Sequence, residues 1–91
     1  MTRPRNIAGP QIRKLRSSRG LTQPMLVARV NLLGWGISRE TLAKIESQFR
    51  WIADAELLCM ARALEVPVTE LLPAKEEDRR VIQNFFGKRK R

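Results

Sequence analysis

The stretch from Gly20 to Glu46 constrains the fold most, because it carries the start signals of two short helices in close succession. Thr22 is a favourable N-cap, and Pro24 falls in the first helical turn, where the missing N–H costs little. The glycines of LLGWG then interrupt the helical pattern. Ser38 restarts it as a second N-cap. The pattern predicts two helices joined by a glycine-containing turn.

Each helix of this pair has one apolar face. Leu26, Val27 and Val30 lie at helical spacing in the first helix. In the second helix, Leu42 and Ile45 are expected to face inward. The outward positions of the second helix are then Arg39, Glu40, Thr41, Ala43 and Lys44. A short, capped helix with a basic free face is suited to enter the major groove of DNA.

The charge of the chain favours an anionic partner. The formal net charge is +9 at pH 7, and the basic residues are unevenly distributed. Residues 1–20 contain six Lys or Arg and no acidic residue, whereas residues 51–74 contain one Arg and four acidic residues. Charge this asymmetric predicts one basic side and favours nucleic acid as the partner over simple solubility.

The missing residue types exclude several kinds of site. The chain has no His and a single Cys, Cys59, so a zinc site of the usual Cys/His type cannot form. A Ser-His or Cys-His nucleophile is excluded as well, and we predict a protein that is not an enzyme and uses no cofactor or metal. No apolar run approaches the roughly 20 residues of a membrane span, and the N-terminus lacks a signal-peptide core, which predicts a soluble, cytoplasmic protein.

The length of 91 residues suits one small domain with tails. Residues 1–8, which contain Arg3 and Arg5, are predicted to be a flexible basic arm. Residues 9–73 are predicted to form the domain. Residues 74–91 are predicted to form a basic tail.

Two further helices are predicted beside the central pair. The first covers residues 10–19, with Gly20 as its C-terminal stop. The second is expected over residues 55–65, with Asp54 as its N-cap. Its expected core face consists of Leu57, Leu58, Ala61 and Leu64. Thr69 is expected to cap a final turn, TELL, whose two leucines close the core.

The C-terminal segment has two open interpretations. Val81, Ile82, Phe85 and Phe86 are spaced i, i+1, i+4 and i+5, as on the apolar stripe of a helix. One interpretation is a short amphipathic helix that packs on the domain or on a second copy of the protein. The other is a mostly disordered tail, which ends in the basic residues KRKR.

Four segments, in this order, resemble the Xre/Cro-type helix-turn-helix family of phage and bacterial repressors. They are IRKLR followed by GLTQ, ISRETLAKIE, DAELLCMARAL and EVPVTELL, and together they extend from Gln11 to Leu72. The resemblance implies an all-α, five-helix domain whose third helix is the recognition helix. It also implies that a homodimer binds double-stranded DNA at a palindromic operator.

The resemblance also implies roles for individual residues. The positions that read base edges in the family correspond to Arg39, Glu40 and Lys44. The positions near the DNA backbone correspond to Thr22, Gln23, Ser38, Thr41 and Arg50. A semi-buried salt bridge between the first and third helices corresponds to Arg16 and Glu46.

The chain departs from the family pattern in three places. The interval between Gln23 and Ser38 is about five residues longer than in a usual helix-turn-helix, so either the helix is extended or the turn is enlarged. Val27 replaces a small alanine at the helix crossing. Gln48 replaces the glycine that usually follows the glutamate of the recognition helix.

These features lead to a functional prediction with one alternative. The predicted function is sequence-specific binding of double-stranded DNA by a transcriptional regulator, a repressor that acts as a dimer. The alternative is an antitoxin-like or other protein-interaction module, in which the C-terminal segment binds a partner protein.

Overall fold

The computed structural model describes residues 3–87, and every regular element in that range is helical. The five α-helices are α1 (Gly9–Ser18), α2 (Gln23–Leu32), α3 (Arg39–Glu46), α4 (Asp54–Leu64) and α5 (Asp78–Phe86). The 3-10 turns Val68–Leu71 and Lys75–Glu77 connect α4 to α5. The predicted all-α fold is confirmed. No helix in this range is long and apolar enough to cross a membrane.

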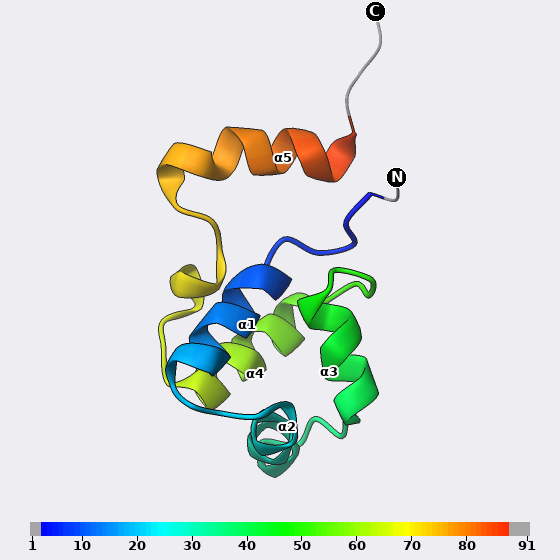
Figure 1. Cartoon of the computed structure of the whole chain (residues 1–91), viewed down its shortest axis with the longest axis vertical. Helices are drawn as coiled ribbons and strands as arrows, with labels where there is room; N and C mark the ends of the chain where they lie inside the picture. Colours follow the sequence, from blue (N-terminus) through cyan, green and yellow to red (C-terminus); the bar gives the residue numbers. More distant parts are fainter. Residues whose placement is uncertain (1–2, 88–91) are drawn as a thin grey trace, which may run out of the picture.

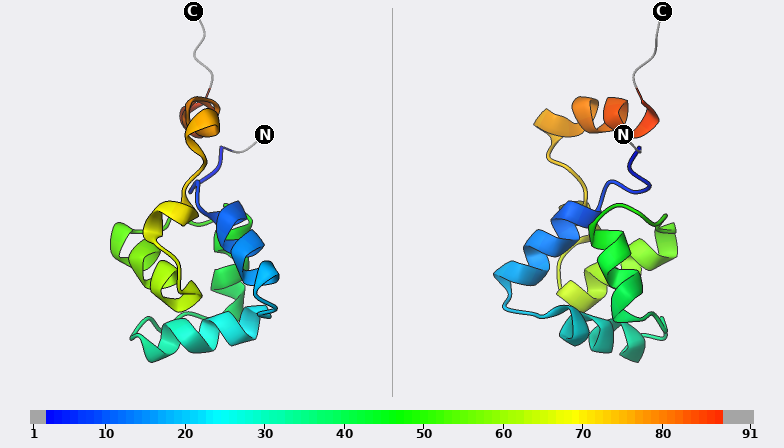
Figure 2. Two further views of the ribbon diagram at one scale, coloured as in Figure 1. Left: turned by 90° about the vertical axis from the view of Figure 1, so that its left-hand side faces the viewer. Right: turned by 45° about the vertical axis from the view of Figure 1, so that its right-hand side comes forward.

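The first four helices pack together, and α5 lies apart from them at one end of the molecule (Figures 1 and 2). α1 packs on α3 and α4, while α2 packs on the same two helices from another side. The turn Val68–Leu71 closes the bundle against α1 and α4. As a result, α3 has α1 and α2 behind it, and its remaining side faces outward.

A single apolar core joins the four helices. Its fully buried large side chains are Ile12, Leu26, Val30, Leu42, Ile45, Met60, Leu64 and Leu71. Burying one such side chain is worth roughly 1.5–3 kcal/mol. The inward positions predicted for the central helix pair are confirmed, with Val27 half-buried at the edge of this core.

Side-chain caps fix the starts of α2 and α3, as the sequence predicts. The Thr22 hydroxyl accepts a hydrogen bond from the backbone N–H of Met25 at 3.3 Å. The Ser38 hydroxyl accepts one from the N–H of Thr41 at 3.2 Å. Each cap satisfies a donor that has no partner within its own helix, which is typically worth about 1 kcal/mol.

The interval between Gln23 and Ser38 is divided between a helix and a turn. α2 covers Gln23–Leu32, and residues 33–38 connect it to α3. The Asn31 amide holds this turn by donating to the carbonyl of Trp35 at 2.7 Å. The turn therefore has a defined attachment to the end of α2.

Asn6 attaches the N-terminal segment to the domain, which differs from the flexible arm predicted for residues 1–8. The Asn6 side chain is buried, and its Nδ2 donates to the carbonyls of Ile45 at 3.0 Å and Arg50 at 2.9 Å. Its Oδ1 accepts from the N–H of Gly9 at 2.7 Å. These partners are 39 and 44 residues away in sequence, so no local pattern could reveal them.

Gly9 allows α1 to begin in close contact with the end of α3. A Cβ atom at this position would lie 2.2 Å from the carbonyl oxygen of Ile45, which is backbone and cannot swing away. α1 accordingly begins at Gly9, one residue before the predicted start. Only glycine fits this approach without moving a helix.

α4 begins one residue earlier than predicted, and Asp54 is not its N-cap. The N-cap is Ala53, whose N–H donates to the carboxylate of Glu56 at 3.0 Å. The inward row of α4 consists of Leu57, Met60, Ala61 and Leu64. Leu58, predicted to face the core, is 62% exposed because it lies about 100° around the helix from Leu57.

The turn after α4 also differs from the prediction. Thr69 lies inside the 3-10 turn and makes no cap, because the turn already begins at Val68 after Pro67. Leu71 is fully buried, whereas Leu72 is 37% exposed. Only one of the two leucines predicted to close the core does so.

The C-terminal segment forms a short amphipathic helix, the first of its two open interpretations. Val81 and Phe85 are half-buried and face the bundle. Ile82 and Phe86 are 52% and 67% exposed. The basic residues 88–91 lie outside the part of the chain that the structure describes.

Candidate nucleic-acid interface

The outward side of α3 is the candidate interface. Arg39, Glu40 and Lys44 are exposed on it, while Thr41 is half-buried. Among residues 3–87, neither Arg39 nor Lys44 forms a salt bridge. The two cations are therefore available to an anionic partner.

The position of Arg39 is not explained by the stability of α3. It lies in the first turn, at the positive end of the helix dipole, where a cation is disfavoured by roughly 0.3–1 kcal/mol. By contrast, Glu40 in the first turn and Lys44 in the last turn have the signs that the dipole favours. An exposed arginine at an unfavourable helix position points to a role outside the fold.

Glu46 fixes α3 from behind. Its carboxylate accepts two hydrogen bonds from Arg16, from Nε at 2.6 Å and from Nη2 at 3.1 Å. It accepts a third from Nε2 of Gln23 at 3.0 Å. The Glu46 side chain is only 3% exposed and that of Arg16 12%. The ion pair that the family resemblance implies is present, and with Gln23 it ties together α1, α2 and α3.

Gln23 and Thr22 lie at the start of α2, but part of their bonding capacity is already used. One amide N–H of Gln23 is donated to Glu46, which leaves the other available. The Thr22 oxygen accepts the capping hydrogen bond, and its own hydrogen can still be donated. The backbone contacts expected of both residues stay predictions.

Ser38 and Thr41 form a hydroxyl pair at the start of α3. Their oxygen atoms are 3.2 Å apart, so one hydroxyl donates to the other. Because Ser38 also accepts the capping hydrogen bond from the N–H of Thr41, the pair keeps one hydroxyl hydrogen that is not committed. This hydrogen lies beside the N-terminus of a helix, a place that suits a phosphate oxygen.

Arg50 is engaged with the protein itself. Its guanidinium donates to the Glu56 carboxylate at 3.1 and 3.4 Å and to the carbonyl of Trp51 at 2.9 Å. It also lies 5.9 Å from the ring centroid of Trp35, within the range of a cation–π contact. The hydrogen bond from Arg50 holds the pKa of Glu56 below its ordinary value, although burial opposes this shift. The first role of Arg50 is thus to join the loop after α3 to α4.

Gln48 takes the backbone conformation that favours glycine. Its φ is +66°, in the left-handed region, at the position where the resembling family has a glycine. Its side chain compensates by donating to the carbonyl of Asn6 at 2.9 Å. The side chain of Gln48 thus helps to hold a backbone conformation that glycine adopts without strain.

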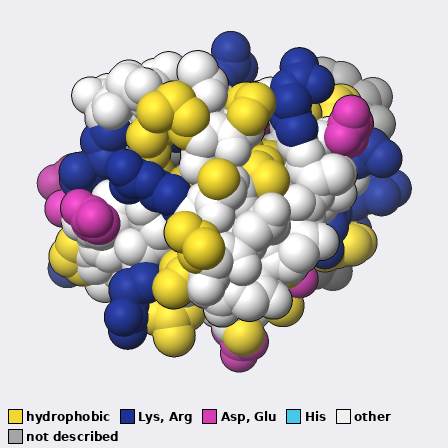
Figure 3. Space-filling view, turned by 90° about the horizontal axis from the view of Figure 1, so that it is seen from below, with side chains coloured by type: hydrophobic (Ala, Val, Ile, Leu, Met, Phe, Trp, Pro, Cys, Tyr) yellow, Lys and Arg dark blue, Asp and Glu magenta, His cyan; other side chains and the backbone are white. Residues whose placement is uncertain are grey.

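The face below α2 combines basic and apolar side chains. In Figure 3, hydrophobic side chains run across the middle of this face, and Lys and Arg side chains lie around its edges. Three exposed apolar residues come from α2 and the turn that follows, namely Met25, Leu32 and Leu33.

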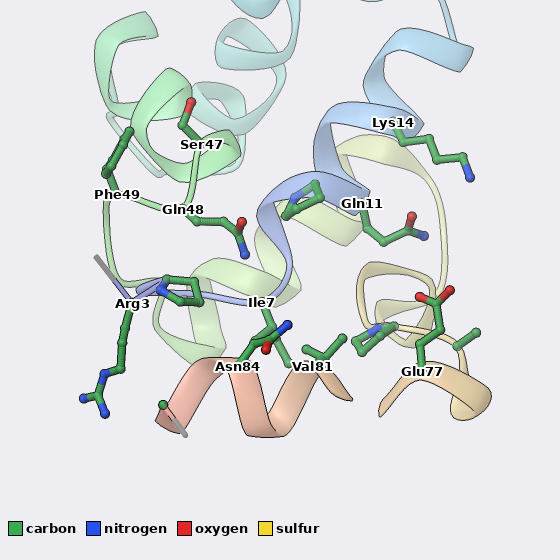
Figure 4. A pocket seen from close by; sticks show the side chains of 15 residues that line it. Arg3, Ile7, Gln11, Lys14, Ser47, Gln48, Phe49, Glu77, Val81 and Asn84 are labelled. Atoms are coloured by element: carbon green, nitrogen blue, oxygen red, sulfur yellow. The ribbon is translucent and has the colours of Figure 1, made fainter. Parts of the chain in front are cut away.

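A groove of about 1040 Å³ lies away from the candidate interface. It separates α5 from α1 and from the loop after α3, with Gln11, Gln48 and Val81 among its lining residues (Figure 4). Arg39, Glu40 and Lys44 do not line it. The groove and the outward side of α3 are therefore separate features of the surface.

Comparison with known proteins supports the fold. No protein-family model matches the chain, and no curated protein matches it. Among solved structures, the chain is similar to the hypothetical transcription factor NHTF from Neisseria, with a TM-score of 0.66 and 23% sequence identity. The similarity covers 89% of this chain and 93% of that chain. At this identity it shows a shared fold, and membership of the Xre/Cro-type family stays a prediction.

Proposed function

We propose that this protein binds double-stranded DNA sequence-specifically as a transcriptional repressor, without catalytic activity, and that α3 enters the major groove. One observation carries the proposal. α3 exposes Arg39 and Lys44 without carboxylate partners in residues 3–87, while Glu46 anchors the opposite side of the same helix. A charged face on a rigidly held helix is what base readout requires. The shared fold with a hypothetical transcription factor favours the same role.

Three side chains of α3 would contact the bases. Arg39 can donate two hydrogen bonds to O6 and N7 of a guanine, a contact worth roughly 1–3 kcal/mol of discrimination. Lys44 carries a point charge, so its contact is less selective. Glu40 follows Arg39 directly and can accept from N4 of a cytosine or orient the guanidinium of Arg39.

Backbone contacts would come from hydrogens that the fold leaves uncommitted. These are the second amide N–H of Gln23, the hydroxyl hydrogen of Thr22 and the free hydrogen of the hydroxyl pair of Ser38 and Thr41. Arg50 has five N–H donors, and its three hydrogen bonds to the protein leave others for a phosphate. Such contacts position a protein on DNA and carry no sequence information.

The anchoring of α3 supports affinity as well as specificity. Arg16 and Gln23 hold Glu46 before any DNA is bound, so binding does not have to order the recognition helix. As a dimer, the protein would read two half-sites about 34–36 Å apart on one face of the duplex. Occupation of such an operator would exclude other proteins from it.

Selection of tight-binding duplexes from a random pool tests this function. The purified full chain should recover an inverted repeat at physiological salt, with a guanine at one conserved position in each half-site. Recovery of no motif, together with binding that only weakens as salt rises, would contradict base readout. It would reduce the exposed cations to general phosphate attraction.

A further inference from the structure

α5 leaves half of its apolar stripe without a partner. Ile82 and Phe86 are 52% and 67% exposed, whereas Val81 and Phe85 face the bundle. A nine-residue helix is too short to be stable alone in water and depends on packing of its apolar side. An exposed apolar row on such a helix marks a surface that another molecule covers.

The attachment of α5 to its own domain is slight. Figures 1 and 2 show the helix standing off the bundle. Phe85 meets Trp51 edge to face, with ring centroids 5.9 Å apart. In addition, Nη1 of Arg3 donates to the carbonyl of Phe86 at 2.6 Å. Trp51 itself stays 59% exposed, so the contact leaves apolar surface open on both sides.

The exposed row of α5 forms one wall of an apolar groove of about 440 Å³. The other wall comes from the body of the domain. The apolar residues on the two walls include Trp51, Ile52, Leu57, Leu72, Ile82 and Phe86. Because the groove and the row that could fill it belong to one surface, two copies related by a two-fold axis can each fill the groove of the other.

The charged residues at this surface could pair with those of a second copy, because each side of the groove carries one basic and one acidic residue. Arg5 and Asp54 line the groove on the domain side. Asp78 and Arg79 precede Ile82 by four and three residues, so they lie on its side of α5. Among residues 3–87 none of these four is in a salt bridge, and a second copy would offer each a partner of opposite sign.

We propose that this surface is the homodimer interface, in which two α5 helices pair antiparallel and each inserts Ile82 and Phe86 into the groove of the other copy. Arg79 of one copy then faces Asp54 of the second, and Asp78 faces Arg5. The inference rests on the proposed function for its expectation of a dimer and specifies where that dimer forms. It leaves the outward side of α3 free for DNA.

The mass of the full chain in solution tests the interface without DNA. Light scattering should give about twice the monomer mass of 10.5 kDa. Ile82→Glu should give the monomer mass, since Ile82 is half exposed and its loss does not disturb the core. Asn84→Glu is the matched control, because Asn84 is exposed on the side of α5 that lines the other groove, and it should stay dimeric.

A charge exchange tests the pairing itself. Asp54→Lys and Arg79→Glu should each weaken the dimer, and the double variant should restore it, which only a second copy of the same chain can explain. A monomeric wild-type chain would overturn the inference and leave the face to a different protein. A dimer that survives Ile82→Glu, or no restoration in the double variant, would overturn it as well.

DNA binding separates this inference from the proposed function. The Ile82→Glu monomer should still bind a single half-site with the sequence preference of the wild type. A wild-type monomer that selects a specific DNA sequence would overturn the interface alone. A dimer sensitive to Ile82→Glu that shows no sequence preference would overturn the proposed function alone.

Discussion

Removal of the Glu46 carboxylate should be the most damaging change at the site. In Glu46→Leu, the guanidinium of Arg16 loses both of its hydrogen bonds to Glu46 and keeps only the one to the carbonyl of Leu21 at 2.7 Å. Gln23 loses its partner too. Because both members of the ion pair are nearly buried, a stranded charge should cost about 3–5 kcal/mol.

This cost is large against the total stability of a small domain, which is about 5–15 kcal/mol. Each kcal/mol moves the midpoint of thermal unfolding by about 4–8 °C in a domain of this size, so Glu46→Leu should lower it by at least about 12 °C. Urea unfolding followed by circular dichroism measures the free energy directly. Arg62→Ala, which removes an exposed arginine of α4 outside any salt bridge in residues 3–87, should change it by less than about 0.5 kcal/mol.

The second step of this test removes the stranded charge. Arg16→Met combined with Glu46→Leu replaces the pair by apolar side chains of similar size, which is often close to neutral. The double variant should therefore cost clearly less than the sum of the two single variants. Costs that add within about 0.5 kcal/mol would refute the reasoning, because they would mean that the two groups act independently.

Substitutions at three further positions test the loops and helix ends around the site. Gly9→Ala should lower the free energy of unfolding and the midpoint of urea unfolding, because its Cβ would lie 2.2 Å from a backbone oxygen of α3; an unchanged midpoint would show that α1 moves freely. Gln48→Gly should be more stable than Gln48→Ala by about 1 kcal/mol in the same assay, because both lose the bond to Asn6 but only alanine keeps the left-handed strain. The pKa of Glu56 is lowered by Arg50, so Glu56 stabilises the fold above its unfolded pKa of 4.5 and this contribution is lost as pH falls through the lower folded value. The difference in unfolding free energy between wild type and Glu56→Gln should accordingly shrink in acid, and a difference that grows there would contradict the ion pair.

Local signals explain what could be predicted from the sequence. Thr22 and Ser38 cap their helices through N–H groups three residues away, so the capping pattern is complete within a short window. The inward positions of Leu42 and Ile45 follow from helical spacing alone. The helix pair and its outward charged face could therefore be inferred without coordinates.

Contacts between residues far apart in the sequence explain which features could not be predicted. The N-terminal segment is attached by hydrogen bonds from Asn6 to the carbonyls of Ile45, in the last turn of α3, and Arg50, in the loop that follows. Nothing near Asn6 in the sequence predicts these contacts. Arg50 is predicted to contact DNA because it is basic and lies in the loop after α3. Its ion pair with Glu56 depends on how α4 packs, which the sequence does not show. The apolar character of Leu58 predicts a core position, but it lies about 100° around α4 from Leu57, and Met60 fills the core instead.

The most direct test of base readout by α3 compares Arg39→Ala with wild type on the selected operator and on duplexes that change its bases one at a time. Arg39→Ala should lose about 1–3 kcal/mol on the operator and lose its preference at one base position, with the other positions still read. Arg62→Ala should behave as wild type. An equal loss on every duplex, with a shallower salt dependence, would contradict the proposal and assign Arg39 to a phosphate.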